Sequence, residues 1–173
     1  MARRYLLWTP ALVIATVAIG FAQAPQKATA VLKNAQGVEV GTATITPASG
    51  GSAVQINATF SKLPPGTHAI HIHTVGKCEA PDFTTAGGHF NPASKQHGKD
   101  NPNGAHAGDL ANFDVAANGT GKISYTVPGV TLADTSLFHA GGTALMIHAS
   151  ADDYKTDPTG NAGARLACGV IQK

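Results

Sequence analysis

The sequence predicts an all-β fold, built as an antiparallel eight-stranded sandwich or flattened barrel with two long loops. Apolar and polar residues alternate with a period of two along 54–60 and again along 123–127, which is typical of strands with one buried face. Glycine is abundant, at 20 residues, and the pairs Gly50-Gly51 and Asn118-Gly119 are hairpin signals. Since no segment shows sustained helical periodicity, short strands joined by tight turns are the expected architecture.

Six further short apolar stretches complete the set of expected strands. Each is a few residues long, as strands in globular proteins usually are. In chain order the expected strands are 29–33, 38–46, 54–60, 68–73, 110–115, 123–127, 143–148 and 165–171.

Two long segments interrupt this regular spacing of strands. Segment 74–108 contains three prolines together with many Gly, Asn and His residues, and segment 150–164 contains Pro158. Loops of this length are uncommon in a compact domain and are usually functional or disordered. Since neither an internal repeat nor a linker is evident, residues 25–173 are expected to form one domain.

Residues 1–24 have the features of a signal peptide. Arg3 and Arg4 form a positive n-region, an apolar run spans 6–21, and Ala22-Gln23-Ala24 supplies a small-x-small cleavage pattern. Cleavage after Ala22 is one alternative, and an uncleaved anchor is another, because the apolar run is almost long enough to span a membrane. Polar residues interrupt that run, so cleavage is favoured. We therefore expect an exported protein, periplasmic or extracellular, with no stable membrane association after cleavage.

The charge balance argues against two classes of partner. The full chain carries 12 basic and 10 acidic residues, a formal net charge of +2. Without Arg3 and Arg4 the two counts are equal, at ten each, and the only tryptophan, Trp8, is also lost with the leader. Binding to nucleic acid or to an anionic membrane surface is therefore not expected.

The two cysteines, Cys78 and Cys168, are expected to form a disulfide. Export places the chain in an oxidising compartment, and an even number of cysteines allows one bridge. In the chain-entropy model, closing a loop of about ninety residues stabilises a fold by about 4–5 kcal/mol. The alternative is a thiolate metal ligand, which is disfavoured because zinc sites usually take their cysteines from short spacings.

The eight histidines are more than a chain of this size needs for packing. On the strand expected at 68–73, His71 and His73 point to one face, whereas Ile70 and Ile72 point to the other. The isoleucines suit the core, so the two imidazoles are expected side by side on the outer face, spaced for one metal ion. Because surface pairs of this kind also arise by chance, the pair alone is weak evidence.

Further donor groups follow along the chain. His89, His97 and His106 precede Asp109, and His148 ends a short apolar run. Three imidazoles and one carboxylate at loop spacing can wrap one ion and suit a closed tetrahedral zinc site. Any one of these histidines could be a solvated loop residue, but the set indicates a metal centre.

Four segments resemble the signature sequences of the copper–zinc superoxide dismutases. They are His71-x-His73, Gly88-His89-Phe90-Asn91-Pro92, His106-x-Gly108-Asp109-Leu110 and, at 160–171, Gly-Asn-Ala-Gly-Ala-Arg-Leu-Ala-Cys-Gly-Val-Ile. The resemblance covers nearly all of the chain after the leader. The position of Cys78 is similar to that in the exported bacterial branch, and the second loop, between His148 and Arg165, is shorter than in the animal enzymes. The family implies a Greek-key β-sandwich and the dismutation of superoxide, the substrate, to dioxygen and hydrogen peroxide.

The resemblance also implies which residues hold the cofactors, copper (Cu2+/Cu+) and zinc (Zn2+). Copper would be held by His71, His73, His89 and His148, and zinc by His89, His97, His106 and Asp109. His89 would bridge the two ions as an imidazolate, and it would leave copper and carry a proton in the reduced state. Imidazole suits both ions, and a metal on each ring nitrogen favours loss of the ring proton near neutral pH.

The family implies an anion guide beside the copper. Arg165 would attract superoxide and is, with His89, the expected catalytic residue. Its alternative role is a structural salt bridge. Thr159 would narrow the channel opposite Arg165, and Lys155 is a further candidate for steering.

The resemblance assigns supporting roles to other residues of the loops and strands. Asp152 would join His71 to His97 and fix the orientation of both rings, unless it is only an exposed loop acid. His68 would be a buried histidine that does not bind metal. His139 matches no functional position and is expected at the surface.

Three other functions on the same fold are alternatives. A metal-binding or copper-delivery protein would be expected to lack copper ligands or Arg165, and a structural module would have substituted loops. A copper-only variant would lack His97, His106 and Asp109, which are all present. The enzyme is therefore favoured, and the sequence leaves open whether the chain is a monomer or a homodimer.

Overall fold

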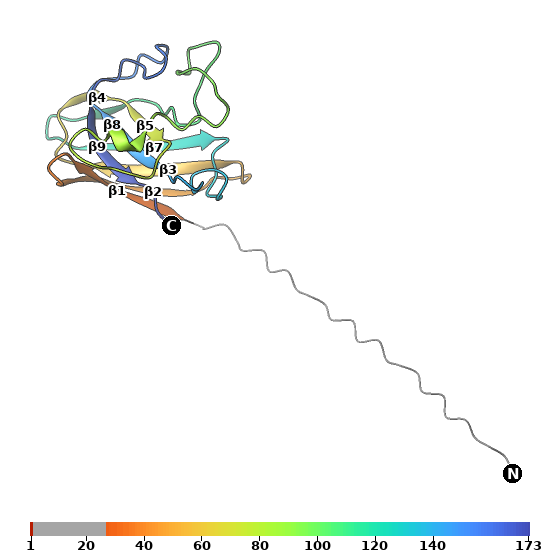
Figure 1. The fold of residues 1–173 in the computed structure, drawn as a ribbon. Helices are drawn as coiled ribbons and strands as arrows, with labels where there is room; N and C mark the ends of the chain where they lie inside the picture. Colours follow the sequence, from red (N-terminus) through yellow and green to blue (C-terminus); the bar gives the residue numbers. More distant parts are fainter. Residues whose placement is uncertain (2–26) are drawn as a thin grey trace.

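The computed structural model describes Met1 and residues 27–173. Residues 27–173 form an all-β domain built on a single antiparallel sheet of nine strands (Figure 1). One 3-10 turn, η1 (Thr84–Ala86), lies in the first long loop. The strands are β1 (Ala28–Asn34), β2 (Glu39–Pro47), β3 (Ala53–Phe60), β4 (Gly66–His68), β5 (Ile70–His73), β6 (Phe113–Val115), β7 (Gly121–Pro128), β8 (Ala144–His148) and β9 (Arg165–Val170). Among the described residues, none belongs to a helix of the length and hydrophobicity needed to cross a membrane.

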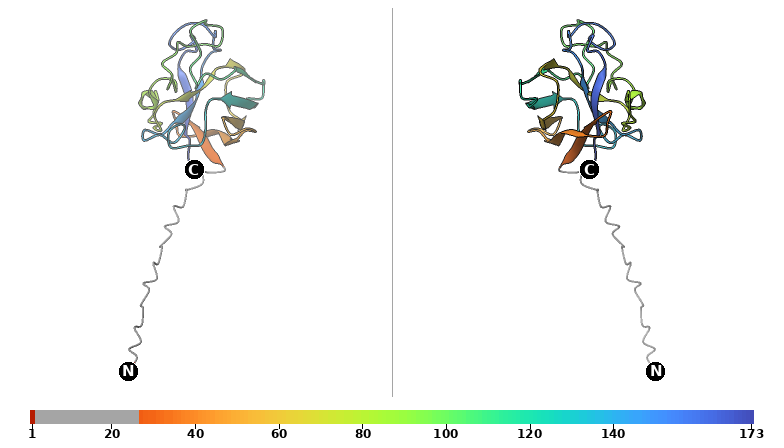
Figure 2. Two further views of the ribbon diagram at one scale, coloured as in Figure 1. Left: turned by 90° about the vertical axis from the view of Figure 1, so that its right-hand side faces the viewer. Right: turned by 90° about the vertical axis from the view of Figure 1, so that its left-hand side faces the viewer.

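The sheet curls into a nearly closed barrel. Its strand order is β4-β6-β7-β3-β2-β1-β9-β8-β5, so the two edge strands are β4 and β5. These strands follow one another in sequence, separated only by Ala69, and this continuity joins the two edges. The connections from β3 to β4 and from β7 to β8 link strands that are not neighbours, as in Greek-key folds. The two views in Figure 2 show the strands around a common interior. The predicted fold class is confirmed.

The strand count differs from the expected eight because segment 68–73 is divided at Ala69. The Ala69 N–H donates to the Ser150 carbonyl at 2.9 Å, and its carbonyl accepts from the His148 N–H at 3.0 Å. The chain therefore changes partner at this residue, from β6 on one side to β8 on the other. The expected strand at 110–115 is also shorter than predicted and begins at Phe113, since Asn112 bonds Tyr154 and Asp152 of the second long loop instead of a strand.

The barrel interior is filled by side chains at every second position of the strands. In β3, Val54, Ile56, Ala58 and Phe60 are buried, as the alternation predicts. Ile70 and Ile72 of β5 belong to the same core. All these residues are at most 5% exposed, so the interior is a packed core.

The first long loop covers the outer face of β8 and β9. Phe83 and Ala86, around η1, pack against Met146 and Cys168 in a second, smaller apolar cluster. The disulfide between Cys78 and Cys168 ties the start of this loop to β9, with a sulfur–sulfur distance of 2.00 Å. Strand β8 is consequently buried on both faces. The second long loop and the later part of the first project at the end of the barrel away from the C-terminus (Figure 1).

The expected signal peptide lies outside the described residues, apart from Met1, and the structure therefore bears only on the domain that follows it.

Candidate metal centre

Strands β5 and β8 present three histidines on the outer face of the barrel. The two strands are antiparallel neighbours, and His71 lies opposite Met146 in their register. Because side chains alternate, His71 and His73 point away from the core that Ile70 and Ile72 enter. His148, at the end of β8, lies on the same outer face. His71 and His73 therefore point to the outer face, as expected. Both imidazoles are nevertheless buried, at 0% and 1% exposure, because the long loops cover them.

Two loop segments run beside β5 and carry His89 and Asp109 to it. The Phe90 N–H donates to the Ile72 carbonyl at 2.8 Å, and the Ile72 N–H donates to the Gly108 carbonyl at 2.9 Å. The Gly108 N–H in turn donates to the Phe90 carbonyl at 2.8 Å. A Cβ on Gly108 would lie 2.3 Å from the Ile72 oxygen, so only glycine permits this approach.

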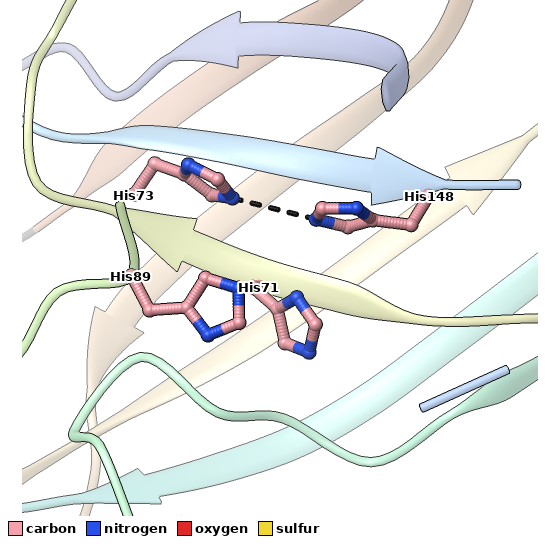
Figure 3. A group of neighbouring side chains, drawn as sticks. All are labelled: His71, His73, His89 and His148. Carbon is pink, nitrogen blue, oxygen red and sulfur yellow. Dashed lines mark hydrogen bonds between the residues drawn. The ribbon is translucent and has the colours of Figure 1, made fainter. Parts of the chain in front are cut away.

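Four imidazoles from these elements converge: His71, His73, His89 and His148 (Figure 3). One nitrogen of each ring lies within 4.8 Å of its counterparts in the other three. The His73 Nε2 and His148 Nε2 atoms are only 3.4 Å apart. Three strand residues and one loop residue therefore form a single nitrogen-lined group.

In each of the three strand histidines, one ring nitrogen points away from the four-imidazole group and bonds another part of the protein. This outer contact determines which nitrogen faces the group. His71 Nε2 bonds to Asp152 Oδ2 at 2.7 Å, and His73 Nδ1 donates to the Gly87 carbonyl at 2.9 Å. The His148 Nδ1 lies 3.4 Å from the Gly163 carbonyl. With their outer nitrogens as donors, His73 and His148 turn two lone pairs toward each other. A bound cation relieves that repulsion.

Two buried nitrogens of the group, His71 Nδ1 and His89 Nε2, have no hydrogen-bond partner in the described part of the chain. A buried polar atom without a partner is costly. Both atoms face the other imidazoles, so a metal ion at this point satisfies them. A nitrogen set of this kind suits Cu(II). The residues present therefore fit a copper ion.

A second group adjoins the first and shares His89 with it. It consists of His89, His97, His106 and Asp109. The His89 Nδ1 is 2.9 Å from Asp109 Oδ1, 3.2 Å from His97 Nδ1 and 3.4 Å from His106 Nδ1. A tetrahedral zinc ion, with ligand distances of roughly 2.0–2.1 Å, spaces its ligand atoms about 3.3–3.4 Å apart. The donor types and the spacing both fit zinc.

The carboxylate of Asp152 joins the two groups. Its Oδ2 bonds His71 Nε2 at 2.7 Å, and its Oδ1 bonds His97 Nε2 at 2.9 Å. Asn112 holds this residue by the main chain, since its side-chain amide bonds both the N–H and the carbonyl of Asp152 at 2.9 Å. Asp152 is buried and is therefore not an exposed loop acid. Sequence reasoning gave Asn112 no role, because its contact forms only when the second loop folds over it.

The electrostatics of the two groups favour bound cations. Burial is the main cause that lowers the pKa of His71 to about 4 and that of His148 to about 3, so these rings are neutral at pH 7. Burial also acts on Asp109, yet hydrogen bonds to His89 and His97 hold its pKa well below the usual range. Burial opposes a proton on His97, but its bonds to Asp109 and Asp152 raise its pKa to about 9.

An open cavity of about 590 Å³ leads to the shared histidine. Arg165 lines it together with His73, His89, His106, His148 and Thr159. Its guanidinium donates to the Phe83 carbonyl at 2.6 Å and to the Gly87 carbonyl at 2.7 Å. Among the described residues that line this cavity, Arg165 is the only Lys or Arg. Lys155 is exposed and does not line it.

Two histidines lie outside both donor groups. His68 is buried and bonds the carbonyl oxygens of His148 and Pro64, each at 2.8 Å. His139, expected at the surface, is half-buried instead, and its ring stacks on Phe90 at 5.8 Å. Neither belongs to a group that could hold a metal ion.

Comparison with known proteins agrees with this geometry. Residues 39–171 match the family model described as copper/zinc superoxide dismutase. The chain is 47% identical over 143 residues to superoxide dismutase [Cu-Zn] 1 of Aquifex aeolicus, covering 80% of this chain and 83% of that protein. It is 41% identical to superoxide dismutase [Cu-Zn] of Caulobacter vibrioides, covering 84% and 85%.

Solved structures show the same fold. One is a double mutant of a SOD-like protein from Bacillus subtilis, in which a tyrosine and a proline are replaced by histidine. It superposes with a TM-score of 0.79 at 40% identity and covers 84% of this chain and 97% of its own. On this family match and these identities, the chain belongs to the copper/zinc superoxide dismutase family.

Proposed function

We propose that this protein is an exported copper–zinc superoxide dismutase, which converts two superoxide anions and two protons to dioxygen and hydrogen peroxide. The observation that supports this most strongly is the sharing of His89 by two adjoining donor groups, with His89 itself lining an open cavity. Family membership supports the same activity.

His71, His73, His89 and His148 would hold copper, and His89, His97, His106 and Asp109 would hold zinc. Bound copper supplies the one-electron oxidation of one superoxide and the one-electron reduction of the other, whereas zinc keeps one oxidation state. His89 turns Nδ1 toward the zinc group and leaves Nε2 without a protein partner among the described residues. We assign to His89 Nε2 the role of holding a proton and passing it to the reduced oxygen species.

Arg165 would bind and orient the anion. Its two hydrogen bonds to carbonyl oxygens fix the guanidinium at the cavity wall, so the charge is positioned before substrate arrives. A fixed positive charge in a cleft raises the local concentration of a small anion. Thr159 lines the same cavity and would limit the size of what reaches the copper group.

Export is proposed from the leader and the disulfide together. Residues 1–24 would be removed as a signal peptide, leaving residues 25–173 as the mature domain in the periplasm or outside the cell. A disulfide that ties a loop to β9 persists in an oxidising compartment and is rare in the cytosol.

Metal analysis combined with a superoxide-removal assay tests this proposal. Purified protein loaded with copper and zinc should bind one of each and should accelerate the loss of superoxide. Protein that binds both metals but leaves superoxide decay unchanged would instead be a metal carrier on this fold, and the proposed activity would be wrong.

A further inference from the structure

Four of the six histidines in the two donor groups share one feature: a hydrogen-bond acceptor at the ring nitrogen that faces away from the group. Asp152 serves His71 and His97, the Gly87 carbonyl serves His73, and the Gly163 carbonyl serves His148. Such partners fix the tautomer and the orientation of a ligating imidazole. His89 needs none, because both of its nitrogens face donor groups.

His106 is the exception within this pattern. Its Nδ1 faces the zinc group, 3.2 Å from Asp109 Oδ1. Its outer nitrogen, Nε2, has no hydrogen bond within the described residues, and Asp157 Oδ1 lies 3.9 Å from it. A shift of about 1 Å would bring these two atoms within the usual hydrogen-bond range.

The same oxygen of Asp157 already holds the neighbouring zinc-group residue. Asp157 Oδ1 accepts a hydrogen bond from the His97 main-chain N–H at 2.5 Å. A single carboxylate therefore lies between the backbone of His97 and the ring of His106. Asp157 belongs to the second long loop, whereas both histidines belong to the first, so the contact connects the two loops.

We propose that Asp157 is a positioning residue for zinc: it accepts the outer N–H of His106 while it holds the main chain of His97. This inference rests on the zinc site of the proposed function. Asp152 and Asp157 then form two attachments from one six-residue segment to His97, one at the ring and one at the backbone. Asp157 would thereby close the set of outer partners around both donor groups.

The effect of removing the carboxylate should be selective for zinc. Asp157→Ala should weaken zinc affinity by about 10–100-fold, as loss of an outer ligand partner typically does. Asp157→Asn keeps an acceptor oxygen but loses the charge, and charge-assisted hydrogen bonds are roughly twice as strong as neutral ones. Its affinity should lie between those of wild type and Asp157→Ala. Copper content should not change, since within the described residues the Asp157 side chain makes no hydrogen bond to a residue of the copper group.

Asp100→Ala is the matched control. Asp100 lies in the same loop as His97, and its side chain bonds only the exposed Lys99 at 3.0 Å within the described residues. Removing it therefore deletes a carboxylate three residues from His97 in the chain without removing a contact to a donor residue. Its zinc affinity should equal that of wild type.

The experiment measures zinc release from the full mature chain to an excess of a coloured chelator, for wild type and the three variants. In parallel, Co(II) replaces zinc, and its visible spectrum reports the ligand geometry. We expect Asp157→Ala to release zinc fastest and to alter the Co(II) spectrum, with Asp157→Asn intermediate and Asp100→Ala unchanged. If Asp157→Ala does not fold, the comparison of Asp157→Asn with wild type decides.

Equal release rates and identical Co(II) spectra for wild type and the Asp157 variants would overturn the inference and leave the proposed function intact. A wild-type protein that takes up no zinc would overturn both, because the zinc site itself would be wrong.

Discussion

Arg165 and His73 donate hydrogen bonds to the same acceptor, the carbonyl oxygen of Gly87, at 2.7 Å and 2.9 Å. One peptide group of the first long loop thereby fixes both the proposed anion guide and a proposed copper ligand. The guanidinium of Arg165 and the imidazole of His73 are consequently held relative to each other by one backbone carbonyl. This arrangement leads to the first prediction.

Reversing the charge at residue 165 should slow the reaction while metal stays bound. Arg165→Glu should lower the rate of superoxide removal by about 10–10³-fold, on the scale of electrostatic steering. Stopped-flow measurements, with copper and zinc content determined in each sample, give the result. Lys155→Glu is the matched control, since Lys155 does not line the cavity, and it should change the rate far less. If both variants react as fast as wild type, the anion guide lies elsewhere.

The two donor groups should lose their metals separately. Asp109→Ala removes the only carboxylate of the zinc group, so zinc binding should weaken while copper remains. His148→Ala should do the reverse, because His148 belongs to the copper group alone. Metal content after dialysis measures both effects. Equal loss of both metals in each variant would argue against two groups that share His89.

A methyl group at residue 160 should disturb the link between the two groups. A Cβ on Gly160 would lie 2.1 Å from Asp152 Oδ1 and 2.5 Å from His97 Nε2. Gly160→Ala should therefore lower zinc affinity as well as stability, since Asp152 must move. Gly129→Ala is the control: it has a similar positive φ, of 72° against 63°, but no atom within 4 Å of the added Cβ. It should lose stability from backbone strain and keep its zinc affinity, so equal zinc affinities for the two variants would contradict this prediction.

Breaking the disulfide should destabilise the fold. Cys78→Ser frees the first long loop from β9, and removing a native disulfide from a small secreted domain costs roughly 2–5 kcal/mol. Thermal unfolding of wild type and variant, each with the same metal content, measures the difference. An unchanged midpoint would show that the apolar cluster around Phe83 and Met146 holds the loop by itself.

The exported protein should lack tryptophan. Trp8 lies in the predicted leader and is the only tryptophan of the chain, so cleavage near residue 24 removes it. Intact mass and fluorescence of protein from the exported fraction test this. A tryptophan emission band, or a mass that includes the first residues, would indicate a retained anchor.

The sequence predicted the fold class and the disulfide because both depend on local signals. The alternation along β3 and the even number of cysteines can be read without knowing any distant contact. The division of segment 68–73 at Ala69 could not be predicted in this way. It arises from hydrogen bonds to Ser150 and His148, about eighty residues along the chain.

In the metal centre, too, the features with a local sequence signal were predicted and those that depend on distant contacts were not. The six histidines and Asp109 were identified from their spacing and from resemblance to the family, and the structure places them in two adjoining groups. Asn112 and Asp157 carried no sequence signal, since their hydrogen bonds join residues that are 40 and 60 positions apart in the chain. The burial of His71 and His73 was missed for a related reason, because a strand pattern cannot show which loops fold over its outer face.

The most direct test of the central claim is the rate of superoxide decay by pulse radiolysis, with the mature protein carrying one copper and one zinc. We predict a rate that is far above spontaneous decay, that depends linearly on protein concentration and that falls as salt rises, since screening shortens electrostatic reach to about 10 Å at 0.1 M. Removal of copper should abolish the acceleration. A fully loaded protein that leaves superoxide decay at its spontaneous rate would contradict the account.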